Sequence, residues 1–326
     1  MPDVAFGAVF RPLAATFLLS AAIAAGCGGS GEGPQPVRLA LDFQPNAVHS
    51  GVYAAIRDGA DERRGVSLEV RAPSSSTDSL KLLGAGRADM AVVDIHDLAL
   101  ARERGSDIVG VGALVQRPLA ALIARDEVRR PKDLIGRRVG VTGLPSDDAV
   151  LRAVLGSDGV RLSEVKRVTI GFSAVPALIA GRVDAVVTFW NAEGVVLRRR
   201  GVGTREFRVD RYGAPRYPEL VLAVERSTLR ERPGLVRDAL AALRDGTLEA
   251  LAAPDAAIQQ VADASGADRA EVRAQFRALE EAFRPPIRLD RDALEAWADF
   301  DVRFGILERR PRVGRAFALS AALSGQ

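Results

Sequence analysis

The sequence predicts an α/β protein made of two similar lobes. Short apolar strands alternate with helical segments, an order typical of βαβ units and of mostly parallel sheets. This alternation begins at residue 37, runs to about residue 124, and starts again near residue 137. From Ser227 onward the pattern is almost entirely helical. A chain of 326 residues is long enough for two lobes of ordinary domain size.

The first run of elements opens with a strand at 37–43, VRLALDF. The elements predicted after it are a helix at about 47–62, a strand at 66–72, a helix at 74–86, a strand at 89–94, a helix at 96–105 and two apolar runs at 107–116 and 119–124. Pro73 ends the second strand, and serines before residue 78 with a glycine at its end delimit the second helix. Arg117–Pro118 separates the two apolar runs.

The second run repeats this pattern. Its predicted elements are a strand at 137–143, a helix after 144–148, a strand at 165–171, a helix at 173–181 and a strand at 184–190. GRADMAVVD at 86–94 and GRVDAVVTF at 181–189 resemble each other, which indicates one such unit in each lobe; chance convergence on a common turn is the alternative. Helices are predicted at 232–253, 254–265, 268–283 and 290–305, with Pro254 and Pro285–Pro286 between them.

The N-terminus has the layout of an export signal. Arg11 precedes an apolar stretch at 13–25, which is too short to span a bilayer, and small residues lead into Cys27. Because AAGC resembles a bacterial lipobox, we predict a lipoprotein signal peptide at 1–26, lipidation of Cys27 and a flexible tether at 27–36. A free cysteine behind an ordinary cleaved signal, or a misassigned start, is the alternative. Nothing after residue 36 is apolar for long enough to be a transmembrane helix.

Composition argues against several classes of function. The excess of 45 basic over 42 acidic residues is only +3, and no basic block is interleaved with aromatics, so nucleic-acid binding is not supported. The chain has no G-x-S-x-G, P-loop, H-E-x-x-H or G-x-G-x-x-G motif at the expected places. We therefore expect neither an enzyme nor a bound metal or cofactor. Of the two histidines, His49 is a plausible ligand contact, whereas His96 is expected to be solvated at a helix start.

Candidate binding residues follow the strands, because ligands of open α/β sheets sit at the carboxyl ends of strands. The residues found there are Asp42, Phe43, Asn46 and His49, then Ser74–Thr77, Asp94, Ser146, Asp147 and Asp148, and finally Trp190, Asn191 and Glu193. A flat ligand could stack on Phe43 or Trp190 while carboxylates accept hydrogen bonds from its amino groups. The alternatives are that Trp190 caps the core, that Glu193 is an ordinary helix-start acid, and that Asp147 and Asp148 only cap their helix.

Several segments together resemble a known family. They are LDFQPNAVHSGVYAA, GAGRADMAVV, VGALVQRPLAALIA, PKDLIGRRVGVTGLPSDDAVL, GFSAVPALIAGRVDAVVTFWNAEG and YPELVLAVE. In this order they resemble the thiamine-precursor (pyrimidine)-binding branch of the ABC-transporter solute-binding proteins, which is related to the fungal thiamine-pyrimidine synthases. The resemblance covers roughly residues 37–225.

The resemblance implies a type II-like periplasmic-binding-protein fold, with lobe 1 at 37–117 and 221–326, lobe 2 at 118–220, and a hinge. The chain would cross to lobe 2 near Arg117–Pro118 and return near Tyr217–Leu222. Ligand-driven closure would present a closed shape to a membrane permease and its ATPase. The resemblance further implies a monomer that is exported and held at the outer face of the membrane by lipidated Cys27.

The resemblance also implies roles for individual residues. It places Phe43, Asn46 and His49 at the cleft, together with Trp190 and Glu193, and makes Glu193 the partner of an aminopyrimidine edge. Gly143, Ser146 and Asp147 would lie near the cleft as well. Two positions depart from the family pattern: relatives often have Trp at the position of Phe43, and commonly have other polar residues at the position of Asp94.

The expected ligand is a thiamine-related pyrimidine precursor, with riboflavin as the alternative heteroaromatic. Sulfonate or nitrate is a second alternative, because anion sites are built from helix N-termini and hydroxyls; the carboxylates of Asp94, Asp147 and Glu193 argue against it. A pyrimidine synthase is a third. Fungal synthases use a cysteine-rich segment and a lysine-bound pyridoxal phosphate, whereas this chain has one cysteine and no lysine near 41–49.

Overall fold

The computed structural model describes residues 33–75 and 77–320. The predicted signal peptide, Cys27 and the first part of the tether lie outside these residues. Within them, no helix is both long enough and apolar enough to cross a membrane.

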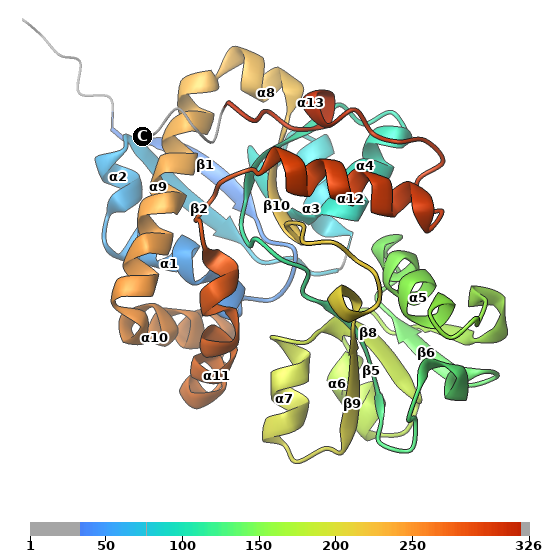
Figure 1. The fold of residues 1–326 in the computed structure, drawn as a ribbon. Coiled ribbons are helices and arrows are strands. Elements are labelled where there is room, and N and C mark those ends of the chain that lie inside the picture. Colours follow the sequence, from blue (N-terminus) through green and yellow to red (C-terminus); the bar gives the residue numbers. More distant parts are fainter. Residues whose placement is uncertain (1–32, 76, 321–326) are drawn as a thin grey trace, which may run out of the picture. The chain divides into compact units, whose positions relative to one another are not determined.

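Two five-stranded sheets form the framework (Figure 1). The first has the order β2-β1-β3-β10-β4, with the strands Val66–Arg71, Gln35–Ala40, Met90–Asp94, Leu220–Glu225 and Ile108–Ala113. The second has the order β7-β6-β8-β5-β9, with the strands Lys166–Thr169, Arg138–Val141, Ala185–Phe189, Ala120–Arg125 and Thr204–Arg208. In each sheet the first three strands are parallel, and the fourth is antiparallel to both of its neighbours.

The two similar nine-residue segments occupy the same position in the two sheets. Their strands, β3 and β8, are the central strands. The aspartate of each turn accepts a hydrogen bond from a backbone N–H of the neighbouring strand: Asp89 from Arg38 at 3.0 Å, and Asp184 from Arg138 at 2.9 Å. The Gly-Arg-x-Asp turn therefore has one physical role in both sheets, which is to fix the start of the central strand against its neighbour.

Helices surround both sheets, and in Figure 1 α5, α6 and α7 accompany the second sheet while α8 to α10, α12 and α13 gather with the first. The α-helices are α1 Ser50–Arg57, α2 Ala60–Arg63, α3 Asp78–Gly84, α4 Ile95–Glu103, α5 Ser146–Gly156, α6 Ala174–Ile179, α7 Glu193–Arg199, α8 Arg226–Glu231, α9 Pro233–Ala252, α10 Pro254–Ser265, α11 Arg269–Leu279, α12 Arg291–Arg303 and α13 Val313–Ala316. Short 3-10 turns lie at η1 Ala47–His49, η2 Pro131–Leu134, η3 Leu162–Glu164, η4 Val209–Arg211 and η5 Glu280–Phe283.

The structure differs from the sequence-based expectations in three places. The single helix expected at 47–62 is divided into η1, α1 and α2, with the last break at Gly59, whose φ of 63° favours glycine. The strands β9 and β10 were not anticipated. The sheets are mixed rather than mostly parallel, because the chain leaves one sheet after β4, enters the other through β5, and returns through β10.

Candidate functional site

A cleft lies where strands of the two sheets end. It encloses about 850 Å³ of space, part of it open to solvent. The carboxyl ends of β3 and β8 and the segments that follow β1 and β6 reach it, together with the starts of β5 and β10. Its lining consists of Asp42, Phe43, Asn46, Ser79, Leu80, Val93, Asp94, Asp97, Ala120, Thr142, Leu144, Ser146, Asp147, Val150, Phe172, Val187, Thr188, Phe189, Ala192, Glu193 and Leu220.

Two phenylalanines supply aromatic surface in this cleft. The rings of Phe43, after β1, and Phe172, before α6, meet edge to face with centroids 4.5 Å apart and planes at 73°. Because aromatic pairs favour this arrangement, the two rings support each other and leave π-faces available to a planar ligand. Phe172 was not singled out in the sequence, although it directly follows a predicted strand.

Glu193 begins α7 and faces the cleft from the second lobe. Burial raises the pKa of its carboxyl group, against hydrogen bonds from the side chain of Thr188 and the backbone of Phe189. The nearby charge of Asp42, which also lines the cleft, raises this pKa further. A ligand that donates hydrogen bonds here would relieve that repulsion.

His49 lies behind the cleft rather than in its lining. Its side chain is fully buried, and Nε2 lies 2.9 Å from Oδ1 of Asp42. Nδ1 accepts a 3.3 Å hydrogen bond from the backbone N–H of Asn46, whose own side chain caps η1. His49 therefore orients Asp42, and the expected direct ligand contact is replaced by a supporting one.

Trp190 and Asn191 also lie outside the described lining. The indole N–H of Trp190 donates to the carbonyl of Pro118 at 3.2 Å, and the Arg208 guanidinium lies 4.2 Å from the ring centroid. The ring is 5% exposed, so the alternative in which Trp190 caps the core describes its position. Asn191 is fully buried, and its side-chain oxygen and nitrogen have no hydrogen-bond partner among the described residues. Sequence reasoning assigned both to the cleft because the end of a strand does not reveal which way each side chain points.

Asp147 lines the cleft and also closes the loop after β6. Its carboxylate accepts hydrogen bonds from the N–H of Thr142 at 3.2 Å, the N–H of Gly143 at 2.9 Å and the hydroxyl of Thr142 at 3.0 Å. Gly143 has a φ of 94°, a conformation that favours glycine, so its role is to shape the loop. Burial raises the pKa of Asp147 to about 6 despite these bonds.

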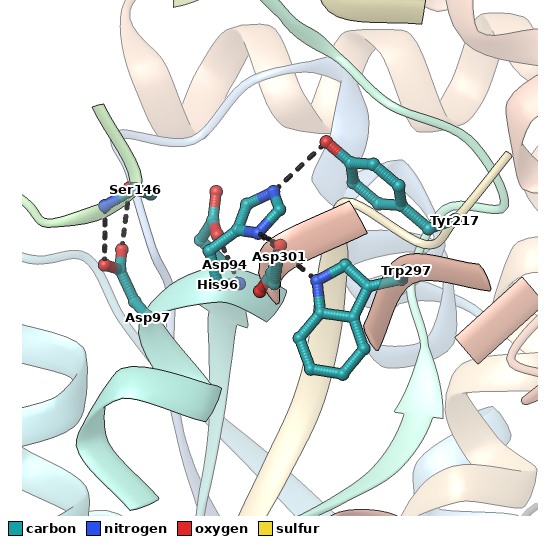
Figure 2. A network of polar contacts seen from close by, with 7 residues as sticks. All are labelled: Asp94, His96, Asp97, Ser146, Tyr217, Trp297 and Asp301. Carbon is teal, nitrogen blue, oxygen red and sulfur yellow. Dashed lines mark hydrogen bonds and ion pairs between the residues drawn. The ribbon is translucent and has the colours of Figure 1, made fainter. Parts of the chain in front are cut away.

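Asp97 joins the two lobes across the cleft. It belongs to α4 of the first lobe and accepts hydrogen bonds from Ser146 at the start of α5, from the N–H at 3.1 Å and from Oγ at 2.9 Å (Figure 2). Burial raises the pKa of Asp97 to about 6. The sequence analysis did not select Asp97 because it lies three residues inside a helix, whereas Ser146 was selected as a helix-start residue.

A buried polar network stands behind Asp94 (Figure 2). His96 is 1% exposed, so the expectation that it is solvated is wrong. Its Nδ1 lies 2.6 Å from Oδ1 of Asp301, and its Nε2 lies 3.1 Å from the hydroxyl of Tyr217. Burial would lower the pKa of His96, but Asp301, Asp94 and Glu219 raise it to about 10, which favours the protonated ring at neutral pH. The indole nitrogen of Trp297 also lies 3.2 Å from Nδ1.

Glu219 links this network to the start of β5. One carboxylate oxygen accepts from the N–H of Leu119 at 2.7 Å and of Ala120 at 3.3 Å, and the other has no partner of full hydrogen-bond geometry. Burial raises the pKa of both Glu219 and Asp94, and the two carboxyl groups interact.

Three side chains of this network have the spacing of metal ligands. Ligand atoms of Asp94, His96 and Glu219 lie within 4.8 Å of one another. A metal would need a free imidazole nitrogen, yet both nitrogens of His96 already have partners, and Tyr217 occupies the Nε2 side. The arrangement therefore suits an imidazolium among carboxylates better than a metal ion.

The described lining has only acidic ionisable side chains. It carries five carboxylates, on Asp42, Asp94, Asp97, Asp147 and Glu193, and no lysine, arginine or histidine side chain. Of the predicted binding residues, Phe43, Asn46, Asp94, Ser146, Asp147 and Glu193 line the cleft. Such a site suits a donor-rich or cationic planar ligand and repels anions.

The fold is that of the periplasmic solute-binding proteins. The alkanesulfonate-binding protein SsuA of Xanthomonas axonopodis pv. citri superposes with a TM-score of 0.71 at 19% identity, covering 88% of this chain and 99% of that one. The chain belongs to the family described as NMT1/THI5 like, which matches residues 46–257. The fold class and the family resemblance deduced from the sequence are thereby confirmed.

Two similar proteins have names that indicate two different functions. The formylaminopyrimidine-binding protein of Halalkalibacterium halodurans is 32% identical over 203 residues, which are 61% of this chain and 62% of that protein, less than two thirds of its length. A Legionella pneumophila protein named 4-amino-5-hydroxymethyl-2-methylpyrimidine phosphate synthase is 24% identical over 263 residues, 78% of this chain and 83% of that protein. The family thus includes both binding proteins and synthases.

Proposed function

We propose that this chain is the solute-binding component of an ABC importer and captures a thiamine-related aminopyrimidine. The observation that carries the proposal is a cleft with an aromatic pair, five carboxylates and no basic side chain in its described lining. An aminopyrimidine is flat and presents N–H donors at its edge. The printed name of the Halalkalibacterium relative supports the same class of ligand.

Recognition would combine two contacts. The pyrimidine ring lies against Phe43 and Phe172, and its exocyclic amino group donates to the Glu193 carboxylate, with Asp42 nearby. A charged acceptor that is partly withdrawn from water gives discrimination, because a ligand without the donor leaves the carboxylate unpaired. No covalent step is required. The chain would act by capture and closure of the lobes.

The lining of the cleft disfavours two of the three alternative functions. Sulfonate or nitrate would meet five carboxylates and no cation, so the similarity to a sulfonate-binding protein extends to the fold alone. A synthase of the lysine–pyridoxal phosphate type would need a lysine at the ligand, and the described lining has none. Riboflavin is flat and donor-bearing as well, so direct titration must separate it from the pyrimidines.

Delivery and anchoring complete the proposal. A closed, ligand-loaded form would dock on a permease driven by an ATPase, and the chain would be exported and held at the outer face of the membrane through lipidated Cys27. The lipobox-like AAGC segment supports the anchor. The solute-binding fold supports the transport role.

Calorimetric titration tests the ligand class. The purified chain is titrated with formylaminopyrimidine, hydroxymethylpyrimidine, thiamine, riboflavin, taurine and nitrate. We expect micromolar or tighter binding of a pyrimidine and no binding of the two anions. Binding of riboflavin alone would keep the transport role and change the ligand, whereas binding of an anion alone would contradict our interpretation of the carboxylates.

Replacement of Glu193 tests its role. Glu193→Gln exchanges a charged acceptor for an amide that must also place an NH₂ group toward the ligand, so aminopyrimidine affinity should fall by about 2 kcal/mol, roughly thirtyfold. Glu69→Gln is the control, because Glu69 is exposed on β2 outside the cleft. Unchanged affinity in Glu193→Gln would remove Glu193 from the proposed contact.

A further inference from the structure

A second hollow lies at the other end of α4 from the cleft. The helix starts beside Asp94 and Asp97 in the cleft, and its last turn brings Arg102 and Glu103 to the hollow. The two sites have no lining residue in common and are therefore separate. The hollow comprises about 600 Å³, part of it open to solvent, and is lined by Ala99, Arg102, Glu103, Leu307, Arg309, Arg310, Pro311, Arg312, Arg315 and Ala316.

Arginine dominates the charge of this hollow, with five guanidinium groups against one carboxylate. Two of the five are already paired. Arg310 contacts Glu295 at 2.8 Å and Asp299 at 2.5 Å, and Arg102 lies 3.8 Å from Asp107. These pairs hold their guanidinium groups in place and offset their charge.

The other three arginines lack acidic partners. Among the described residues, the side chains of Arg309, Arg312 and Arg315 make neither an ion pair nor a hydrogen bond, and all three are exposed. Glu103 is occupied by the backbone N–H of Arg309 at 3.2 Å. Three unpaired guanidinium groups around one hollow carry an uncompensated positive charge.

The backbone that bears these arginines is held in place. Leu307, Val313 and Phe317 are each 3% exposed or less and anchor the segment in the core. The carbonyl of Arg315 accepts a 2.7 Å hydrogen bond from Arg226, and the N–H of Ala318 donates to the carbonyl of Gly110 at 2.9 Å. A fixed backbone lowers the entropy that a ligand must remove when it orders the side chains.

We propose that this arginine hollow binds a phosphate group. The guanidinium fork matches phosphate oxygens with paired hydrogen bonds, and three forks suit the three terminal oxygens of a phosphomonoester or the phosphate of a lipid headgroup. The cleft is lined by acidic side chains and no basic one, so of these two hollows only the arginine hollow suits a phosphate. The site would let the chain respond to a phosphorylated metabolite or rest on an anionic bilayer, independently of the ligand in the cleft.

The test uses the unacylated Cys27→Ser chain, so that no lipid anchor contributes. Binding of inorganic phosphate and glycerol phosphate is measured by calorimetry at low salt. Sedimentation with vesicles of phosphatidylglycerol and phosphatidylcholine is compared with sedimentation with phosphatidylcholine alone. The variant is Arg309→Gln/Arg312→Gln/Arg315→Gln. The control is Arg71→Gln/Arg87→Gln/Arg182→Gln, which removes the same charge from exposed arginines that line neither the cleft nor the arginine hollow.

We expect saturable binding. The hollow variant should weaken the affinity at least about tenfold, and the control variant should weaken it less than about twofold. Binding of the soluble phosphates would identify a metabolite as the source of the group. Binding of phosphatidylglycerol vesicles alone would identify a lipid headgroup. No saturable binding in either assay, or an equal loss in the control, would overturn the proposal, the latter because net charge alone would then explain the binding.

Discussion

At the scale of single residues, the cleft depends on side chains that never touch its surface. His49 fixes Asp42, and the imidazolium of His96 holds the carboxylates around Asp94 together. Such supporting residues explain why a site lined with five carboxylates can be compact: buried cations and backbone donors compensate part of the charge. The remaining repulsion favours a ligand that brings its own donors.

Asp301→Asn tests the strongest of these buried pairs. Removing the charge leaves the His96 imidazolium without its nearest counter-ion, so the free energy of unfolding should fall by about 3 kcal/mol at pH 6. The folded-state pKa of His96 is about 10 and its ordinary value is 6.5, so the stabilisation is complete below pH 6.5 and disappears as the pH rises through 10. The loss caused by Asp301→Asn should therefore be smaller at pH 10 than at pH 6.

Urea denaturation at the two pH values measures this difference. Asp299→Asn is the control on the same helix, because its carboxylate is 67% exposed and pairs with the surface residue Arg310. Asp299→Asn should lower the free energy of unfolding by less than about 1 kcal/mol at either pH. If Asp301→Asn lowers the free energy of unfolding equally at both pH values, the pair stabilises the fold through packing rather than through charge.

At the scale of elements, the close contact of α1 with α9 shows how small residues set the packing of the first lobe. A Cβ atom on Gly246 would lie 2.2 Å from the carbonyl oxygen of Gly51 and 2.5 Å from the backbone nitrogen of Ala55. Backbone atoms cannot move aside as a flexible side chain can. The helices must therefore separate to accept any side chain at residue 246.

Gly246→Ala should destabilise the protein although alanine favours helices. The expected overpacking cost of 1–3 kcal/mol, about the range seen in packed cores, exceeds the gain of about 1 kcal/mol in helix propensity. Gly234→Ala, near the start of the same helix, has open space around the new Cβ and should leave the melting temperature unchanged or higher. Equal melting temperatures for the two variants would contradict this packing.

Some strands of this structure could be predicted from the sequence, and others could not. Apolar runs predicted β3, β4, β5 and β8 because burial on both faces selects such runs, whereas β7, KRVT, was predicted although all of its residues are exposed. The edge strand β9, TREFR, lacks that signal, and the antiparallel insertions of β5 and β10 depend on where a distant part of the chain returns. In the site, the cleft lining includes Phe43, Asn46, Asp94, Ser146, Asp147 and Glu193 from the sequence-based selection, and their contact with a ligand stays a prediction. The side-chain directions of His49, Trp190 and Asn191 are set by tertiary contacts, which local sequence does not encode.

At the scale of the whole molecule, the proposed function requires the lobes to open and close. Leu119 and Glu219 are joined by a hydrogen bond where the chain passes between the two sheets, and Asp97 and Ser146 are joined across the cleft. If the cleft opens as proposed, we expect the second contact to break and the first to remain. The balance between open and closed forms should therefore be sensitive to Ser146 in particular.

Ser146→Ala should shift the ligand-free protein toward the open form. The substitution keeps the backbone N–H but removes the hydroxyl donor, which leaves the buried Asp97 carboxylate short of one hydrogen bond at a cost of about 1–2 kcal/mol, or roughly five- to thirtyfold in the closed-to-open ratio. Because the pKa of Asp97 is about 6, the carboxylate is charged at pH 7.5 and largely neutral at pH 5, so the shift should be larger at pH 7.5. Small-angle X-ray scattering of ligand-free protein at both pH values would report this shift as an increased radius of gyration.

Ser157→Ala is the control. The Ser157 hydroxyl donates to the carbonyl of Val154 in α5 at 2.7 Å, away from Asp97, so its removal should leave the radius of gyration unchanged. A radius of gyration that Ser146→Ala does not alter at pH 7.5 would mean that this contact does not govern closure.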